Sequence, residues 1–320
     1  MPCDGSGGII LLKGNSDDIR LARATVDIMS DEKAQQCIHR NFRDIRMKIY
    51  ISVDMEGVAG VVSGEQLRPD GFEYQRFREF MTSEVNAAIG AAIDCGVSEI
   101  VISDSHGNGQ NLLIEHLSND VQLVRSWPRP LMMMEGIDET FAGAILLGYH
   151  TGAANCRGVR SHTMSSARLT EIKLNGTSMS EAGINAAIAG YFGVPVIAVT
   201  GDDATAEETV DLLGDVETAV VKESIGFHSA KMFSPARARE VISESVKKAI
   251  TRIDTFKPFV LEPPINLELS FQNIRPAELL SYLPIVSRTG SRSVSYLAKD
   301  MIEVSKFIGF ALSYDSSLEP

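Results

Sequence analysis

The fold is decided by residues 47–57, which read MKIYISVDMEG. The run from Lys48 to Val53 is apolar and rich in β-branched residues, which is typical of a buried strand. Similar runs follow at residues 99–103, 143–147 and 196–200, with a further one at 218–222. Longer segments of helical periodicity separate these runs, and such alternation is the signature of βαβ units. The sequence therefore predicts an α/β fold with a largely parallel sheet sandwiched by helices.

Three of the intervening segments have the apolar spacing of amphipathic helices. They cover residues 74–94, 181–192 and 236–253. Ser180 is a suitable N-cap for the second helix, because its hydroxyl can accept a hydrogen bond from the first turn. Pro235 suits the start of the third.

Two changes of pattern divide the chain. The opening is Gly/Ser-rich and continues with mixed charges, with an amphipathic helix expected at residues 17–29. Three prolines within residues 257–264 interrupt the later pattern, after which strand-like and helical pieces mix. We expect three parts: an N-terminal extension, helical or disordered, at residues 1–46; an α/β domain with the candidate site at 47–256; and a smaller α+β module at 257–320.

Charge and hydropathy exclude two classes of partner. The formal net charge of -12 disfavours nucleic-acid binding, because a phosphate backbone requires a cationic face. No apolar run approaches the ~20 residues of a membrane helix, and Met1 to Gly14 lack the basic region of a secretory signal. The 44% hydrophobic content is ample for a packed core. We expect a cytoplasmic globular protein that binds neither nucleic acid nor membrane.

The four cysteines are scattered and form no Cys-x-x-Cys pair, which argues against both a thiolate zinc site and a disulfide framework. Cys156 is near the candidate chemistry in sequence, but it lacks an evident activating partner. We therefore place it outside the site.

Acidic and histidine side chains follow three of the predicted strands. Asp54 and Glu56 come directly after the first strand at spacing i, i+2, so that in extended backbone they point to the same side. His106 follows the second strand and His150 the third, and ligands bind at this edge of an open parallel sheet. His162 lies in the next loop. The remaining histidines, His39, His116 and His228, are in helical or surface-like contexts and receive no role.

This residue set indicates metal chemistry. Imidazole and carboxylate are ligands that a borderline divalent ion such as Zn²⁺ accepts, and a thiolate-free site that keeps an open position is catalytic in type. A carboxylate shared between two ions would make a two-metal hydrolase site. A lone acidic turn or a hydrogen-bonded loop histidine would explain any one of these residues, but not their convergence.

Five short blocks occur in a fixed order along the chain. They are Ser52-Val53-Asp54-Met55-Glu56-Gly57, Asp104-Ser105-His106, Gly148-Tyr149-His150, Ser161-His162 and Glu181-Ala182-Gly183. From Met47 to its end the chain thereby resembles the zinc D-aminopeptidase family of metallopeptidases. Residues 1–46 have no counterpart in this pattern.

The resemblance implies a binuclear zinc site with two ions per subunit. Asp54 would bridge the ions, Glu56 and Glu181 would complete one, and His106 and His150 the other. The metal role of Glu181 rests on the resemblance, since a carboxylate in a first helical turn is otherwise favoured by the helix dipole. His162 matches the family residue proposed as nucleophile or base. We favour a general base or an oxyanion-stabilising group, because the metal pair can itself activate water.

The resemblance also implies the activity and the assembly. The substrates would be short peptides from which the N-terminal residue, a D-amino acid, is removed. The subunits would form a ring-shaped, self-compartmentalising homo-oligomer, a decamer of stacked pentamers. Selectivity between D- and L-residues depends on pocket walls that motifs do not locate.

Two polar residues near the strand ends are open to two interpretations each. Asp104 could orient His106 or cap a turn. Lys222 could reach the pocket and bind a substrate carboxylate, or it could be an ordinary solvated lysine.

Two other functions are compatible with the residue set. One is a two-metal hydrolase of another bond, a phosphoester or a non-peptide amide, because the same site geometry supports both chemistries. The other is a non-catalytic metal-binding scaffold that keeps the ring assembly. An open metal position beside a candidate base argues against the scaffold.

Overall fold

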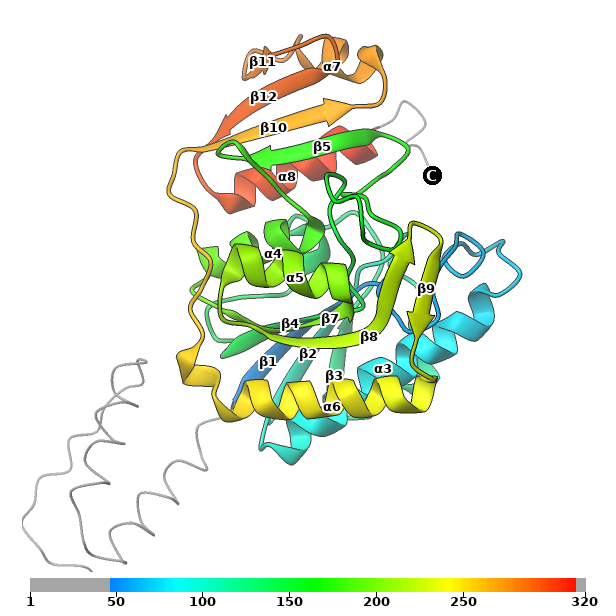
Figure 1. The fold of residues 1–320 in the computed structure, drawn as a ribbon. Coiled ribbons are helices and arrows are strands. Elements are labelled where there is room, and N and C mark those ends of the chain that lie inside the picture. The colour runs from blue at the N-terminus through cyan, green and yellow to red at the C-terminus, as the bar shows by residue number, and fades with distance from the viewer. Residues whose placement is uncertain (1–46, 315–320) are drawn as a thin grey trace, which may run out of the picture. The chain divides into compact units, whose positions relative to one another are not determined.

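The larger layer of the structure is a seven-stranded sheet. The computed structural model describes residues 47–314, so the N-terminal extension and its expected helix lie outside the described residues. The strand order is β3-β2-β1-β4-β7-β8-β9, parallel except for the β8–β9 hairpin (Figure 1). The strands are β1 (Lys48–Val53), β2 (Glu99–Asp104), β3 (Val121–Val124), β4 (Gly143–Leu147), β7 (Val196–Asp202), β8 (Glu217–Gly226) and β9 (Ser229–Met232).

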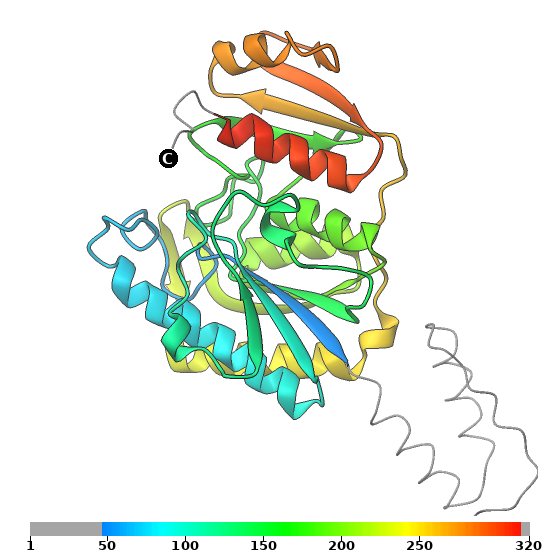
Figure 2. The same ribbon diagram turned by 180° about the vertical axis from the view of Figure 1, so that it is seen from behind.

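Helices cover both faces of this sheet. They are α3 (Tyr74–Asp94) and α6 (Pro235–Thr251) on one face, and α4 (Glu181–Tyr191) and α5 (Asp203–Leu213) on the other (Figures 1 and 2). Residues of β1 alternate accordingly: Ile49 and Ile51 pack in the core under α3 and α6, whereas Tyr50 belongs to the core with α4. The predicted α/β sandwich is confirmed, and Ser180 caps α4 by accepting a hydrogen bond from the Gly183 N–H at 3.3 Å.

A second, antiparallel sheet forms a smaller layer. Its order is β11-β12-β10-β5-β6, and its strands are β5 (Leu169–Leu174), β6 (Thr177–Ser178), β10 (Ile265–Phe271), β11 (Val286–Arg288) and β12 (Ser293–Ala298). The helices α7 (Ile274–Leu280) and α8 (Met301–Ser313) accompany it, and short 3-10 turns lie at Ile114–His116, Met132–Met134 and Ile253–Thr255.

The smaller sheet is not built by the end of the chain alone. β5 and β6 come from the middle of the sequence, and β5 pairs with β10. Met301 and Phe307 of α8 share one apolar core with Ile184 of α4 and Leu267 of β10. The described part of the chain accordingly belongs to one compact unit. The three-part division of the chain stays a prediction.

The helices of the described residues include none that is both long and apolar enough to cross a membrane.

Candidate metal centre

The fold brings the six predicted site residues together at one edge of the large sheet. Asp54 and Glu56 follow β1, His106 follows β2 and His150 follows β4, all at the carboxyl ends of parallel strands. The last two come from elsewhere: Glu181 is the first residue of α4, and His162 lies in the loop between β4 and β5.

Two glycines let the ends of β1 and β4 approach closely. The Gly57 N–H donates to the Gly148 carbonyl at 2.7 Å. A Cβ on Gly57 would lie 2.1 Å from the Tyr149 carbonyl oxygen, and one on Gly148, whose φ is +72°, would lie 2.2 Å from that of Asp54. Any larger residue would push the strands apart. The glycines therefore allow Asp54 and His150 to meet.

Asp54 lies at the centre of the cluster. Its Oδ1 is 3.2 Å from His106 Nδ1, and its Oδ2 is 3.3 Å from His150 Nε2. Glu56 Oε2 is 2.9 Å from the same nitrogen of His106, and Glu181 Oε1 is 3.4 Å from the same nitrogen of His150. Of the three groups that could hold an ion, one consists of Glu56, His150 and His162, and the other two both contain Asp54. This grouping joins His106 to Glu56 and His150 to Glu181, which differs from the pairing that the resemblance implied.

Backbone carbonyls orient both imidazole rings. His106 Nε2 lies 2.8 Å from the Leu67 carbonyl oxygen, and His150 Nδ1 lies 2.9 Å from that of Thr151. A carbonyl oxygen can only accept, so each of these nitrogens carries the proton and donates. In the neutral rings the lone pairs of His106 Nδ1 and His150 Nε2 would therefore point into the cluster, as is usual for metal-bound histidines.

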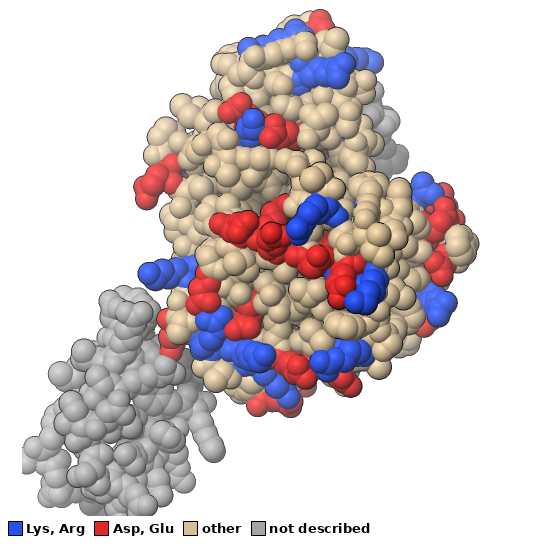
Figure 3. All heavy atoms as spheres, viewed as in Figure 1, with Lys and Arg blue, Asp and Glu red and all other residues tan. Residues whose placement is uncertain are grey.

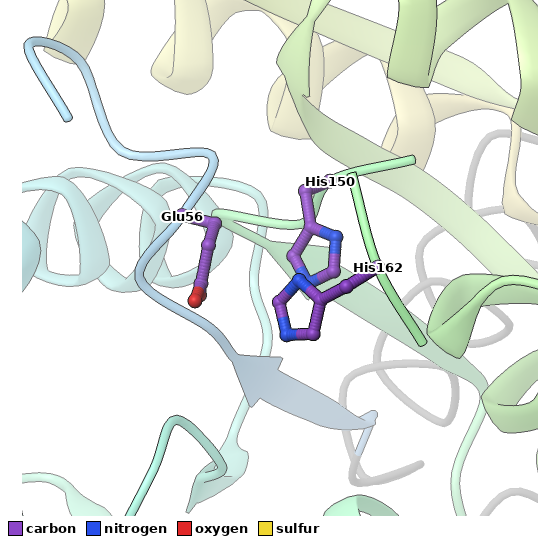
Figure 4. Close-up of side chains that lie close together, drawn as sticks. All are labelled: Glu56, His150 and His162. Carbon is purple, nitrogen blue, oxygen red and sulfur yellow. The ribbon is translucent and has the colours of Figure 1, made fainter. Parts of the chain in front are cut away.

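His162 lies against His150. The two rings stack with centroids 4.2 Å apart and an interplanar angle of 6°, and Glu56 faces them from across the site (Figure 4). His162 Nδ1 is 2.8 Å from the Arg160 carbonyl oxygen, which leaves Nε2 without a proton in the neutral ring, 3.7 Å from Glu181 Oε1. The His162 side chain is 17% exposed and that of His150 only 1%. His162 thus presents Nε2 where a ligand can reach it.

The buried donor atoms fit a metal ion. Asp54 Oδ2, Glu56 Oε2 and His150 Nε2 make no hydrogen bond although each is buried. An unsatisfied buried polar group costs about 1–3 kcal/mol, and more when it is charged. Carboxylate oxygens and unprotonated imidazole nitrogens that converge without partners are a ligand set for a divalent cation such as Zn²⁺. The residues present therefore fit the ions that the resemblance implies.

The electrostatics of the cluster favour a cation. Burial by itself would raise the pKa of Asp54 and Glu181, but the neighbouring imidazoles outweigh it and lower both. Burial would lower the pKa of His106 and His150, but the carboxylates beside them raise both well above the usual value. The cluster thus holds positive charge strongly, and a divalent ion can replace the protons on the imidazoles.

The cluster lies at one side of a pocket of about 770 Å³. Apolar side chains form much of the remaining wall, among them Trp127, Met132, Met164 and Phe310. Arg168 and Lys306 also line it, and neither makes an ion pair with another described residue. The pocket therefore has an acidic, metal-compatible side and a cationic part, with apolar walls.

Three other residues considered from the sequence lie outside this pocket. Asp104 accepts hydrogen bonds from the backbone N–H groups of Asn111 and Leu112 at 2.6 and 2.7 Å, so it caps the loop. It is linked to the His106 backbone through Asn111, whose Nδ2 donates to Asp104 Oδ1 and to the His106 carbonyl. The prediction that Lys222 could reach the pocket is wrong, because its ammonium group is buried against backbone carbonyls. Cys156 is exposed.

Cys156 lines a separate open pocket of about 600 Å³ with Glu207, Glu208 and Asp211. Acidic side chains gather near the middle of the face seen in Figure 3. Glu208 already accepts hydrogen bonds from the Gly152 N–H and from Asn155, so its carboxylate is occupied within the loop.

Sequence reasoning missed the groups that hold the ligands in place. The carbonyls of Leu67 and Thr151 orient the rings, but backbone acceptors leave no residue-type signal. Tyr149 belongs to the block Gly148-Tyr149-His150, but nothing in the sequence indicated its role. Its buried hydroxyl is 2.6 Å from Ser52 Oγ and accepts from Asn185 Nδ2 at 2.8 Å, which ties β1, β4 and α4 together behind the site.

Comparisons with known proteins agree with this geometry. A family model described as D-aminopeptidase matches residues 47–310, which include all six site residues. The chain belongs to the D-aminopeptidase family. A curated D-aminopeptidase from Bacillus subtilis (strain 168) is 38% identical over 260 residues, which cover 80% of this chain and 93% of that relative. The predicted membership is confirmed, and with it the prediction that the chain belongs among peptidases.

A solved structure of the D-aminopeptidase family has the same fold. It is described as the Zn-dependent D-aminopeptidase DppA from Bacillus subtilis, a self-compartmentalizing protease. The match has a TM-score of 0.79 at 35% identity and covers 84% of this chain and 100% of that one. The fold described above is therefore shared with this relative.

Proposed function

We propose that this protein is a zinc-dependent aminopeptidase that removes an N-terminal D-amino acid from short peptides at a two-metal site. The observation that carries the proposal is the buried cluster of donor atoms without hydrogen-bond partners at the side of a pocket. Membership of the D-aminopeptidase family supports the proposed peptide hydrolysis. The description of the structural relative as Zn-dependent supports zinc as the metal.

Five side chains would hold the two ions. Asp54 would be shared, since its two oxygens face different histidines. Glu56 and His106 would complete one site, and His150 and Glu181 the other. When bound, the ions would acidify a water molecule and polarise the scissile carbonyl group.

His162 would act as a general base. Its Nδ1–H donates to the Arg160 carbonyl, so the neutral ring offers the lone pair of Nε2 to the pocket. Nε2 can take a proton from the attacking water, and the resulting imidazolium can then donate to the leaving amine or the developing oxyanion. Stacking on His150 keeps the ring in this orientation.

The charge pattern of the pocket fits a zwitterionic peptide. The metal side of the pocket would receive the N-terminal amine of the substrate, while Arg168 or Lys306 would receive its C-terminal carboxylate. The substrates are therefore short peptides with both ends free.

The test is amino-acid release by the zinc-loaded protein from D-Ala-D-Ala and L-Ala-L-Ala, each with a chelator control. We expect chelator-sensitive release from the D-dipeptide and restoration by added zinc. Full activity in metal-free protein would overturn the metal requirement. Release from the L-dipeptide alone would keep an aminopeptidase and overturn its chirality.

A third substrate in the same assay, the C-terminal amide of D-Ala-D-Ala, examines the cationic part of the pocket. Loss of one charge-assisted contact of about 1.4 kcal/mol corresponds to a roughly tenfold higher KM with little change in kcat. Equal KM values for the amide and the free dipeptide would show that neither Arg168 nor Lys306 binds the carboxylate.

We also propose that the subunits assemble into a homo-oligomeric ring, a decamer. The description of the structural relative as a self-compartmentalizing protease supports assembly. Sedimentation or light scattering should give the mass of ten chains of 34.8 kDa. A monomeric mass at working concentration would contradict the ring. The cytoplasmic location that the sequence predicts stays a prediction.

A further inference from the structure

Lys222 is a buried lysine that does not face the active-site pocket. It lies in β8 with 2% of its surface exposed. Its ammonium group donates to three backbone carbonyls, those of Glu56, Val58 (3.1 Å) and Val61 (2.8 Å). An ammonium group has three N–H donors, so all three are used. The described residues supply no carboxylate that forms an ion pair with it. The ammonium group therefore finds its hydrogen-bond acceptors in one short segment.

That segment, residues 56–61, depends on Lys222. It runs directly on from β1 and contains Gly57 and Gly60, the latter at φ +91°. Its three carbonyls converge on the ammonium group. The Val58 carbonyl also accepts from the Val61 N–H at 3.1 Å, but without the cation those of Glu56 and Val61 would be buried acceptors lacking a donor among the described residues. From the other side, Glu84 of α3 accepts from the Ala59 N–H at 3.0 Å. Lys222 thus binds carbonyl oxygens of this turn, and Glu84 binds one of its N–H groups.

The same loop serves one of the two metal sites. Glu56 begins it and is a proposed ligand. Leu67, further along, accepts from His106 Nε2 at 2.8 Å and so sets the direction of the other ligand of that site. His150 is oriented by the Thr151 carbonyl instead, and Glu181 belongs to α4, so no carbonyl of residues 56–67 orients either one. The contact of this loop with the β4 end is made by the Gly57 N–H, which Lys222 does not bind. The loop therefore supports the Glu56–His106 site selectively.

We propose that Lys222 is a positioning residue that fixes the Glu56 backbone and thereby maintains the metal site of Glu56 and His106. The inference rests on the proposed metal centre. Without the ammonium group the Glu56 and Val61 carbonyls lose their donor and turn toward solvent, and Glu56 loses its fixed position. The site of His150 and Glu181 stays intact. Lys222 acts through Glu56 and touches neither substrate nor metal.

The test is Lys222→Met, which keeps a long side chain and removes the charge and the donors. Zinc affinity is measured by competition with a chromophoric chelator, beside Lys231→Met, a control at an exposed lysine of the adjacent β9. Changing a group that orients a ligand typically weakens metal affinity by about 10- to 100-fold. We expect that loss for one of the two ions only, and unchanged binding of both in the control.

A metal-independent measurement separates this inference from the proposed function. Hydrogen exchange of peptides covering residues 56–67 in the metal-free protein should be faster in Lys222→Met than in the wild type. If Lys222→Met does not fold, Lys222→Gln keeps a shorter donor and should show the same selective loss to a lesser degree.

Two results would overturn the inference: unchanged exchange of residues 56–67, or equal weakening of both ions in a folded variant. If the wild-type protein binds no zinc, that result contradicts both the proposed function and the metal part of this inference. The exchange rates would still decide whether Lys222 fixes the loop.

Discussion

Replacing Asp54 by asparagine removes both zinc ions and nearly abolishes peptide hydrolysis. Asp54 is the one side chain in both ligand groups, and an amide cannot bridge two cations as a carboxylate does. Loss of the ions removes several kcal/mol of transition-state stabilisation, which corresponds to a fall in kcat of about 10³-fold or more. Asparagine keeps the acceptor for the Met55 N–H, so the fold should persist.

The readouts for Asp54→Asn are bound zinc, dipeptide turnover and the thermal unfolding transition. Asp211→Asn, at an exposed carboxylate of α5 remote from the cluster, serves as the matched control and should behave as the wild type. A folded Asp54→Asn protein with both ions retained would contradict the bridging role.

Replacing His162 by glutamine leaves both zinc ions bound and lowers kcat. The Nε2 atom of His162 is 3.7 Å from Glu181 Oε1 and is not needed by either Asp54-centred group. Loss of a general base lowers kcat by about 10²- to 10⁴-fold, with little change in KM. His228→Gln, at an exposed histidine outside the site, is the control.

Zinc content and steady-state kinetics check this division of roles. Glu56, His150 and His162 also form a group that could hold an ion. A His162→Gln protein that lost one zinc would therefore make His162 a ligand, and the general base would have to be sought elsewhere in the pocket.

The strands of the large sheet were predictable from the sequence because parallel strands are buried on both faces and have continuous apolar runs. All five predicted strands are present within β1, β2, β4, β7 and β8. The short β3 at the sheet edge and the exposed β9 were missed, since their residues are only partly buried. The second sheet was missed as a unit because β5 pairs with β10 across a long separation in sequence.

Some residues of the candidate site could be predicted from the sequence alone, and others could not. Asp54, Glu56, His106 and His150 follow from residue types at strand ends, because parallel strands bring those ends to one edge. The metal role of Glu181 could be predicted only from the family resemblance, because this residue begins a helix and does not follow a strand. The role of Lys222 could not be predicted, because burial of a long charged side chain depends on carbonyls brought to it from another strand end.

Family membership also decides between the alternative functions. A phosphoesterase or a bare scaffold would be compatible with the same ligand set, but the matched family and the curated relative are D-aminopeptidases. The pocket agrees with that assignment, since it joins a carboxylate-rich side to apolar walls and to the cationic side chains of Arg168 and Lys306.

The most direct test of the two-metal centre is the zinc content of the purified wild-type protein, measured by mass spectrometry after equilibration with zinc and removal of the free ion. We predict two zinc ions per chain in the wild type and none in Asp54→Asn. A wild-type protein that binds no zinc, or one ion that survives Asp54→Asn, would contradict a centre built around Asp54.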